Sequence, residues 1–261
     1  MLAEEGSGEL QALPRKGIQS IETGVRLLDA LIESRQPLRL RELSKLSGLS
    51  PSKARMYLVS FIRSGLIAQD KISGLYSPGS KALRLGLVAL GQNRIVSSAR
   101  EFVYDFGRET GYPALMTVWD SMSPVIVESS ESRDVLPITF RIGAHMPLWT
   151  TATGEVFLAY LPPKIVEQAI AQGCPHDLEP VIRQAVEQVR RQGYAYANSV
   201  RLTSTATLNG YGTLAAPLLS SEGQLESVLT VLMPIAPGSE PPEKLAGRLI
   251  ERISHLSQSL Y

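Results

Sequence analysis

Apolar residues recur every three or four positions in the first part of the chain, which predicts amphipathic helices there. The first helix is predicted over residues 21–32, and Pro37 limits how far it extends. Its expected buried face consists of Ile21, Val25, Leu28, Leu31 and Ile32. A second, shorter helix is predicted from Leu40, Leu43 and Leu46, with Gly48 placed to end it in a left-handed conformation.

The third helix has the clearest start signal in the chain, at Ser50 and Pro51. A serine oxygen accepts from the free amides of a first helical turn, and proline fits the first helical position because no donor is needed there. The expected buried face consists of Ala54, Leu58, Phe61 and Ile62. Gly65 supplies a stop. Because Gly48 and Ser50 are so close in sequence, we expect a tight turn between the second and third helices.

Two short runs after the third helix predict strands. Residues 66–68 and 75–77 flank the segment Lys71–Gly74, whose glycine suits the positive φ of a hairpin turn. Three short helices followed by a hairpin make a winged helix-turn-helix, which we expect over residues 17–80. Residues 1–16 show no periodicity, and we expect a disordered tail there.

The rest of the chain alternates between helical and strand patterns. Leu83, Leu87 and Leu90 predict a linker helix over residues 81–92, and a larger domain is expected over residues 93–261. Its helices are expected at about 96–106 (closed by Gly111), 152–161, 164–172, 178–192 and 242–257, and its strands at 115–119, 124–128, 137–142, 212–219 and 225–233. This order favours an α+β domain in which helices pack against one sheet.

Charge is distributed unevenly along a chain whose formal net charge is only +1. Between Arg15 and Arg84 there are 13 Lys and Arg against 5 Asp and Glu, whereas the residues after Arg84 carry 13 bases against 17 acids. The basic excess therefore coincides with the predicted winged helix-turn-helix. Such a concentration of bases is typical of domains that bind nucleic acid, because the phosphate backbone attracts it.

Cysteine content and hydropathy indicate the compartment. Cys174 is the only cysteine, which excludes an intrachain disulfide framework and fits a reducing environment. No apolar run approaches the roughly 20 residues of a membrane span, and the first residues lack the order of a signal peptide. The sequence predicts a cytoplasmic protein with no membrane partner.

The start of the third helix carries the side chains that we expect to reach DNA bases. A helix that enters the major groove end-on presents its first residues to the base edges, where Lys and Arg donate to guanine O6 and N7. The expected base-reading residues are Ser50, Ser52, Lys53, Arg55 and Met56. Arg39, Arg41 and Lys71 are expected to contact phosphates of double-stranded DNA. The alternatives are a merely solvated helix face and a winged helix that binds protein.

Three separate blocks of the chain share their residues and their order with one known family. The blocks are GIQSIETGVRLLDAL (17–31) with PLRLREL (37–43) and GLSPSK (48–53), then MPLWTTATG (146–154) with LAYLPP (158–163), and last RQGY (191–194) with GTLAAP (212–217). On these residues the chain resembles the IclR family of bacterial transcriptional regulators over about residues 17–258. Three blocks in the right order are far less expected by chance than one motif.

The resemblance implies an N-terminal winged helix, a linker helix and a C-terminal GAF-like domain that binds a small effector and forms a homodimer or homotetramer. A regulator of this kind would control a catabolic operon. The implied effector-binding residues are Leu148, Thr150, Thr151, Thr153, Gly154, Tyr211, Thr213, Thr230 and Leu232. Two positions depart from the family: Met56 stands where an arginine is common in the recognition helix, and Leu75 stands where a base is common in the wing.

The segment after Tyr194 also departs from the family, and this bears on the effector. Family members often have acidic residues there, whereas residues 195–207 read AYANSVRLTSTAT, with hydroxyl groups, Arg201 and no carboxylate. A buried carboxylate needs donors and preferably a guanidinium, so Arg201 favours a small organic acid as the effector, aromatic acids among the candidates. The alternative is a solvated surface loop with Arg201 in water.

Signatures of catalysis are missing from the sequence, and no cofactor is expected. There is no GxSxG, HExxH or GxxxxGK motif, and His145, His176 and His255 are scattered. Cys174 and His176 are close in sequence, but two potential ligands in a loop do not make a metal site. A hydrolase or metal enzyme is one alternative function, and a ligand-binding protein without DNA binding is another.

Overall fold

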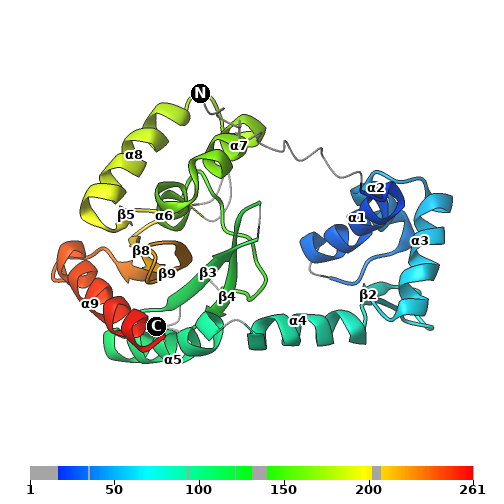
Figure 1. Cartoon of the computed structure of the whole chain (residues 1–261), viewed down its shortest axis with the longest axis horizontal. Helices are drawn as coiled ribbons and strands as arrows, with labels where there is room; N and C mark the ends of the chain where they lie inside the picture. The colour runs from blue at the N-terminus through cyan, green and yellow to red at the C-terminus, as the bar shows by residue number, and fades with distance from the viewer. Residues whose placement is uncertain are drawn as a thin grey trace, which may run out of the picture. The chain divides into compact units, whose positions relative to one another are not determined.

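The structure is a computed structural model that describes residues 17–34, 36–92, 94–120, 122–130, 140–201 and 207–260. The chain separates into two compact units, divided between Ala89 and Leu90. The first unit contains α1 Gln19–Ser34, α2 Leu40–Ser47, α3 Pro51–Ser64, β1 Ile67–Gln69 and β2 Tyr76–Pro78 (Figure 1). The helix α4, Ser80–Gln92, crosses the division along the chain.

The predicted helix-turn-helix and hairpin are confirmed in the first unit. The hydroxyl of Ser50 accepts from the amide of Lys53 at 3.4 Å, and Gly65 ends α3 with φ +78. β1 and β2 pair antiparallel, and Gly74 takes φ +72 in the turn between them. The core of this unit consists of Leu27, Ala30, Leu31, Leu43, Leu49, Ala54, Leu58, Ile67 and Tyr76, which come from all three helices, the turn and the hairpin.

The predicted buried face of α1 is wrong for three of its five residues. Ile21, Val25 and Ile32 are exposed, whereas Leu31 is buried and Leu28 packs, partly buried, against the core. Leu27 and Ala30, which were not expected, are buried. The helix carries two apolar stripes on opposite sides, and α2 and α3 cover the stripe that has fewer large side chains. The pattern of the sequence alone favoured the exposed stripe because that stripe carries more of the large apolar side chains.

The second unit is built on an antiparallel sheet, which among the described residues has five strands in the order β4-β3-β9-β8-β5. Its strands are β3 Ala114–Trp119, β4 Pro124–Ser129, β5 Ala195–Ala197, β8 Tyr211–Leu219 and β9 Leu225–Pro234. A separate short pair is formed by β6 Val200–Arg201 and β7 Thr207–Leu208. The sequence did not reveal β5, β6 or β7, which are only two or three residues long.

Helices cover both faces of this sheet (Figure 1). On one face α5 Arg94–Thr110 and α9 Pro242–Leu260 pack against strands β3, β8 and β9 through residues such as Phe106 and Leu249. On the other face lie α6 Ala152–Tyr160 and α8 Glu179–Gln192, with α7 Pro163–Gly173 beside α8. The α+β class and the helices expected here are confirmed.

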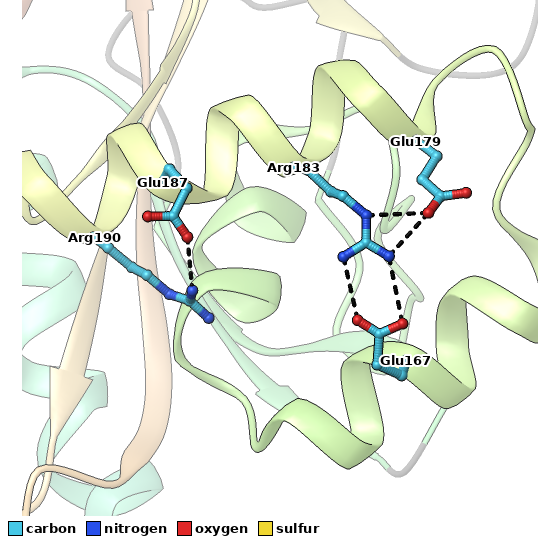
Figure 2. Close-up of polar contacts among 5 residues, drawn as sticks. All are labelled: Glu167, Glu179, Arg183, Glu187 and Arg190. Atoms are coloured by element: carbon cyan, nitrogen blue, oxygen red, sulfur yellow. Dashed lines mark hydrogen bonds and ion pairs between the residues drawn. The ribbon is translucent and has the colours of Figure 1, made fainter.

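Polar contacts at the surface join α8 to α7 (Figure 2), and a further hydrogen bond joins α8 to α6. The guanidinium of Arg183 on α8 donates to Glu167 of α7 at 3.2 Å and to Glu179 of α8 at 2.9 Å. Arg190 pairs with Glu187 at 2.9 Å and also donates to the carbonyl of Ala159 in α6 at 2.9 Å. These contacts link α8 to the other two helices that cover this face of the sheet.

On the opposite face α5 is fixed closely to β4. Arg100 of α5 donates to the carboxylate of Glu128 at 2.7 Å, and Glu128 is only 3% exposed. Seven residues later along α5, Gly107 approaches the hydroxyl of Ser130 so closely that a Cβ would overlap it. The position of α5 on the edge of the sheet is therefore set at two points.

The prediction of a strand at residues 137–142 is wrong for residues 140–142, which the structure describes. Phe140 to Ile142 form a loop, and residues 137–139 lie outside the described part, as do residues 1–16, where a tail was expected. The pairing occurs a few residues later, because Gly143, with φ +80, turns the chain so that Ile126 exchanges hydrogen bonds with Gly143 and Ala144. None of the helices in the described residues is both long and apolar enough to cross a membrane.

Candidate DNA-binding and effector-binding sites

The turn between α2 and α3 is held by backbone and side-chain hydrogen bonds. The amides of Gly48 and Leu49 donate to the carbonyls of Lys45 and Ser44 at 3.4 and 3.1 Å, and Gly48 takes φ +66. The hydroxyl of Ser44 in turn donates to the carbonyl of Leu49, whose side chain is buried in the core. The turn therefore fixes where α3 begins relative to α2.

The residues expected to read bases lie on the surface at the start of α3. Ala54 and Leu58 face the core of the first unit. The exposed set is Ser50, Ser52, Lys53, Arg55 and Met56, as expected. Ser50 differs from the others because its hydroxyl caps the helix, so it positions the first turn as well as facing solvent.

The basic side chains of this region are exposed and can therefore contact an anionic partner. Arg39 and Arg41 lie at the start of α2, where the amide of Arg39 donates to the carboxylate of Glu42 at 2.7 Å. Among the residues that the structure describes, no ion pair involves Arg39, Arg41, Lys53, Arg55 or Lys71. No described residue of the first unit neutralises their positive charge through an ion pair.

The hairpin has an ordered turn at its tip. One carboxylate oxygen of Asp70 accepts from the amides of Ile72 and Ser73 at 3.1 and 2.7 Å and from the hydroxyl of Ser73 at 2.8 Å. The amide and hydroxyl of Ser73 hold the pKa of Asp70 below its usual value. This turn presents Lys71 and Ile72 to solvent.

The hairpin is also tied to the chain before α2, a contact that the sequence did not predict. Leu38 and Tyr76 exchange two backbone hydrogen bonds of 2.9 and 2.8 Å. A single bridging residue leaves no periodic pattern in a sequence, so only the structure could reveal this link.

The effector candidates on β8 and β9 share the sheet face that α6 covers. In the register of these strands Thr213 lies opposite Leu232, and Ala215 lies opposite Thr230. Residues directly opposite in an antiparallel pair point to the same face, so these side chains are neighbours. Thr213, Thr230 and Leu232 are all buried. The sheet thus places two threonine hydroxyls among apolar side chains.

The start of α6 brings further candidates to the same face. Thr151 caps α6: its hydroxyl accepts from the amide of Gly154 at 3.0 Å and donates to the carbonyl of Pro147 at 2.7 Å. The hydroxyls of Thr153 and Thr230 lie 2.8 Å apart. Gly154 lies so close to the backbone of Leu148 that a Cβ would overlap the Leu148 carbonyl. The start of α6 therefore brings Thr153 to Thr230, and Leu148, Thr151 and Gly154 pack against one another in the same turn.

Three other candidates are less closely connected. Thr150 is half-buried in the loop before α6, and Tyr211 is half-buried at the start of β8, opposite Pro234. The backbone of Arg201 belongs to β6, but its side chain and residues 202–206 lie outside the described part. The expected role of Arg201 stays a prediction.

An apolar cluster beside these threonines was missed by the sequence reasoning. Leu115, Ile126 and Ala144 are buried together, with Phe140 and Met146 packed against them. Leu115 lies opposite Thr230 in the register of β3 and β9, so this cluster adjoins the candidate site. Alternating apolar residues in β4 were a usable signal for Ile126, whereas the contribution of Ala144 depends on the loop.

Glu155 is the ionisable group nearest in sequence to this site. It lies in the first turn of α6, one residue after Gly154, and is half-buried. Burial raises the pKa of its carboxyl group to about 7. The protein therefore holds a carboxyl group beside the candidate site that changes charge near neutral pH.

One group of side chains in the second unit has the composition of a catalytic triad but not its geometry. The hydroxyl of Ser123 and the carboxylate of Asp120 both approach Nδ1 of His145, at 2.5 and 3.6 Å. A triad needs the serine on one ring nitrogen and the carboxylate on the other, so this arrangement does not activate a nucleophile. Burial raises the pKa of the Cys174 thiol, which disfavours its reactive thiolate form.

Two models of known protein families match the chain. The IclR helix-turn-helix domain matches residues 20–71, and the bacterial transcriptional regulator IclR C-terminal domain matches residues 87–237, which is more than half of the chain. The chain belongs to the IclR family. This IclR protein is therefore a DNA-binding transcriptional regulator with a ligand-binding C-terminal domain, and its relatives are regulators rather than enzymes.

Individual relatives agree with the family. The HTH-type transcriptional regulator XynR of Escherichia coli (strain K12) is 27% identical over 222 residues, which cover 82% of this chain and 85% of the relative. The glycerol operon regulatory protein of Streptomyces coelicolor is 31% identical over 151 residues, 56% of this chain and 58% of the relative.

A solved structure shows the same fold at lower identity. An IclR homologue from Microbacterium hydrocarbonoxydans, complexed with 4-hydroxybenzoate, is 17% identical and has a TM-score of 0.72, covering 92% of this chain and 98% of that one. This similarity establishes the architecture of the IclR protein described here, not its ligand.

Proposed function

We propose that this IclR protein binds a specific operator through α3 and that a small organic acid, bound beside α6, controls the binding. In this proposal residues 17–80 bind DNA, residues 81–92 form the linker, and residues 93–261 bind the effector and form the oligomer. The observation that carries the proposal is the exposed start of α3, where Lys53 and Arg55 make no ion pair among the described residues. Because the operator lies on the chromosome, the proposed location is the bacterial cytoplasm.

Each exposed residue has a proposed role at the DNA. Ser52, Lys53, Arg55 and Met56 face the base edges of the major groove, and Ser50 fixes the start of the helix that carries them. Arg39, Arg41 and Lys71 contact phosphates, which orient the protein without reading sequence.

The proposed effector is a carboxylic acid, and aromatic acids are the first candidates to test. The start of α6 supports this class, because the helix dipole places partial positive charge at a helix N-terminus, which favours a negative group. The 4-hydroxybenzoate held by the Microbacterium homologue is a small aromatic acid. The proposed contacts are Leu148, Thr150, Thr151, Thr153, Gly154, Tyr211, Thr213, Thr230 and Leu232, with Arg201 as counter-charge. The names of relatives such as the glycerol operon regulatory protein support control of a catabolic operon.

A homodimer, or a homotetramer made of two dimers, is the proposed assembly. α4 buries none of its side chains in the described residues, and Leu83, Leu85, Leu87, Val88 and Leu90 are exposed along it. Exposed apolar surface of this extent typically marks an interface, and a second copy of α4 would cover it. Sedimentation analysis of the full chain should therefore show a dimer or tetramer, and a monomer at micromolar concentration would contradict this part of the proposal.

The DNA-binding proposal is tested with genomic fragments of the source bacterium. Fragments retained by the purified full-length protein are sequenced, and the dissociation constant of the enriched fragment is measured at several salt concentrations. We expect one enriched sequence and a steep loss of affinity with salt, because phosphate contacts release counterions. Retention without any enriched sequence would contradict specific binding.

The effector proposal is tested by calorimetric titration of the full-length protein. The ligands are 4-hydroxybenzoate, benzoate and short aliphatic acids, with the neutral amide of 4-hydroxybenzoate as the matched control. We expect heat of binding from at least one acid and a change in operator affinity with the same acid. Binding of the neutral amide alone would exclude a carboxylate as the recognised group.

A further inference from the structure

The outward face of α3 has an apolar residue at its centre. Met56 is two residues from both Ala54 and Leu58, so at about 100° per residue it lies on the opposite side of the helix from these two core residues. Its side chain is 68% exposed. Ser52 lies one turn earlier on nearly the same line, and the bases Lys53 and Arg55 lie on either side of that line.

This position restricts the groups that Met56 can recognise in DNA. A thioether side chain has no donor, so it cannot replace the hydrogen bonds that Lys and Arg make to guanine. The apolar group that the major groove presents is the C5-methyl group of thymine. Methionine is flexible and polarizable, which suits contact with a methyl group at a surface.

The surrounding charge indicates which partner covers this side chain. The exposed bases on both sides of Met56 make no ion pair in the described residues, and an anionic duplex would neutralise them. Ile72, which is 99% exposed, and Leu46 are also apolar residues on the surface of this unit, but neither lies on the outward face of α3.

We propose that Met56 reads the C5-methyl group of a thymine in the operator, so that each half-site has a thymine at the position facing this residue. The inference rests on the DNA binding proposed above. It adds the identity of one base to that proposal: thymine is favoured at the position facing Met56, while Lys53 and Arg55 favour guanine at flanking positions.

The test removes single methyl groups from the DNA. Each thymine of the selected operator is replaced in turn by deoxyuridine, which keeps the base pair and lacks only the C5-methyl group, and the dissociation constant of the full-length protein is measured at fixed salt. Burial of one methyl group corresponds to about a fourfold change in affinity. We expect a loss of about this size at one thymine, or at a symmetry-related pair.

Protein variants assign that loss to Met56. Met56→Ala should bind the thymine operator about as weakly as the wild type binds the deoxyuridine operator, and should not respond to deoxyuridine at that position. Met56→Leu, which keeps an apolar side chain, should retain the response. Val59→Ala is the matched control, because Val59 is also exposed on α3, at 43%, but lies one turn further from the helix start.

Two outcomes would overturn the inference: a wild type that is indifferent to deoxyuridine at every thymine, and a Met56→Ala variant that still responds. Both differ from a failure of the proposed function, in which the wild type would enrich no DNA sequence at all. Circular dichroism is used to check that the Met56 variants are folded. We expect that they are, because Met56 lies on the surface.

Discussion

The two candidate sites of this regulator differ in the state of their polar groups. At the start of α3, Lys53 and Arg55 are exposed and make no ion pair among the described residues. Beside α6, by contrast, Thr153 and Thr230 are buried and hydrogen-bonded to each other. The hydroxyl of Thr151 both donates and accepts a hydrogen bond. The first site offers unused charge on a rigid support, whereas the second is a set of satisfied groups.

This difference sets what each site requires of its partner. DNA can contact Lys53 and Arg55 without displacing an ion pair of the described residues, so its binding should depend mainly on charge. A ligand beside α6 has to exchange partners with hydroxyls that are already bonded, and the net gain of such an exchange is small for each bond. Effector binding is therefore expected to rearrange the start of α6.

The largest expected effect is the loss of stability in Gly154→Ala. The added Cβ would overlap the carbonyl oxygen of Leu148, and a backbone atom cannot move aside as the end of a flexible side chain can. We expect the free energy of unfolding to fall by about 3 kcal/mol or more. Chemical denaturation of the full chain measures the change.

Gly247→Ala is the matched control for that substitution. Gly247 lies within α9, and a Cβ there meets no atom of the described residues within 4 Å. Since alanine favours helix over glycine, this variant should be stabilised by up to about 1 kcal/mol. Equal losses in the two variants would show that the packing at Gly154 is not special.

The next effect in size is on DNA affinity. Replacing Lys53 and Arg55 together by alanine should weaken operator binding about 100-fold and reduce its salt dependence, because two contacts to the DNA are removed. Thermal unfolding should be unchanged, since both side chains are exposed. The control is the double variant Lys164→Ala and Arg191→Ala, two exposed bases of the second unit, for which a similar loss would contradict a localised DNA site.

A smaller effect follows from the raised pKa of Glu155. Between its ordinary value of 4.5 and about 7, the folded protein keeps the proton that the unfolded chain has lost, so stability falls as pH rises through this range. Partial exposure reduces the cost to about 1–2 kcal/mol. Glu155→Gln should remove this fall when unfolding is followed from pH 4 to 8.

The measured quantity is the difference in the free energy of unfolding between the wild type and Glu155→Gln at each pH. This difference cancels the titration of groups that the two proteins share. The exposed Glu222→Gln substitution serves as the control. If the wild type gained stability relative to Glu155→Gln as pH rises, the carboxylate would be favoured by the fold, contrary to its burial.

The smallest effect is expected for Arg183→Ala. This side chain bridges Glu167 and Glu179, but it is 51% exposed and its ion pairs are in contact with water (Figure 2). Such pairs contribute below about 1 kcal/mol. Urea denaturation should find a change of that size, and a loss comparable to that of Gly154→Ala would show that α7 depends on this one residue.

The parts of the fold that were predictable carry local signals. Ser50 and Pro51 start α3, and Gly48 and Gly65 end helices in a left-handed conformation, so these boundaries depend only on neighbouring residues. The exposure of the candidate DNA-binding side chains on α3 was predictable for the same reason, because side chains opposite a core stripe face solvent.

The parts that were not predictable depend on tertiary contacts. Which stripe of α1 is buried is decided by α2 and α3, and the bridge of Leu38 to Tyr76 depends on the position of the hairpin. In the effector region the sequence indicated Thr153 and Thr230, but their bond to each other joins residues far apart in the chain. The neighbouring cluster of Leu115, Ile126 and Ala144 could not be assembled without the sheet register.

The contact between α5 and β4 has a mechanical consequence for the way α5 can move within the second unit. A shift of α5 along β4 would separate the buried carboxylate of Glu128 from Arg100, and an unpaired buried charge costs several kcal/mol. Rotation of α5 about its axis is also opposed, because Gly107 lies in close contact with Ser130. We therefore expect α5 and β4 to move together as one rigid body.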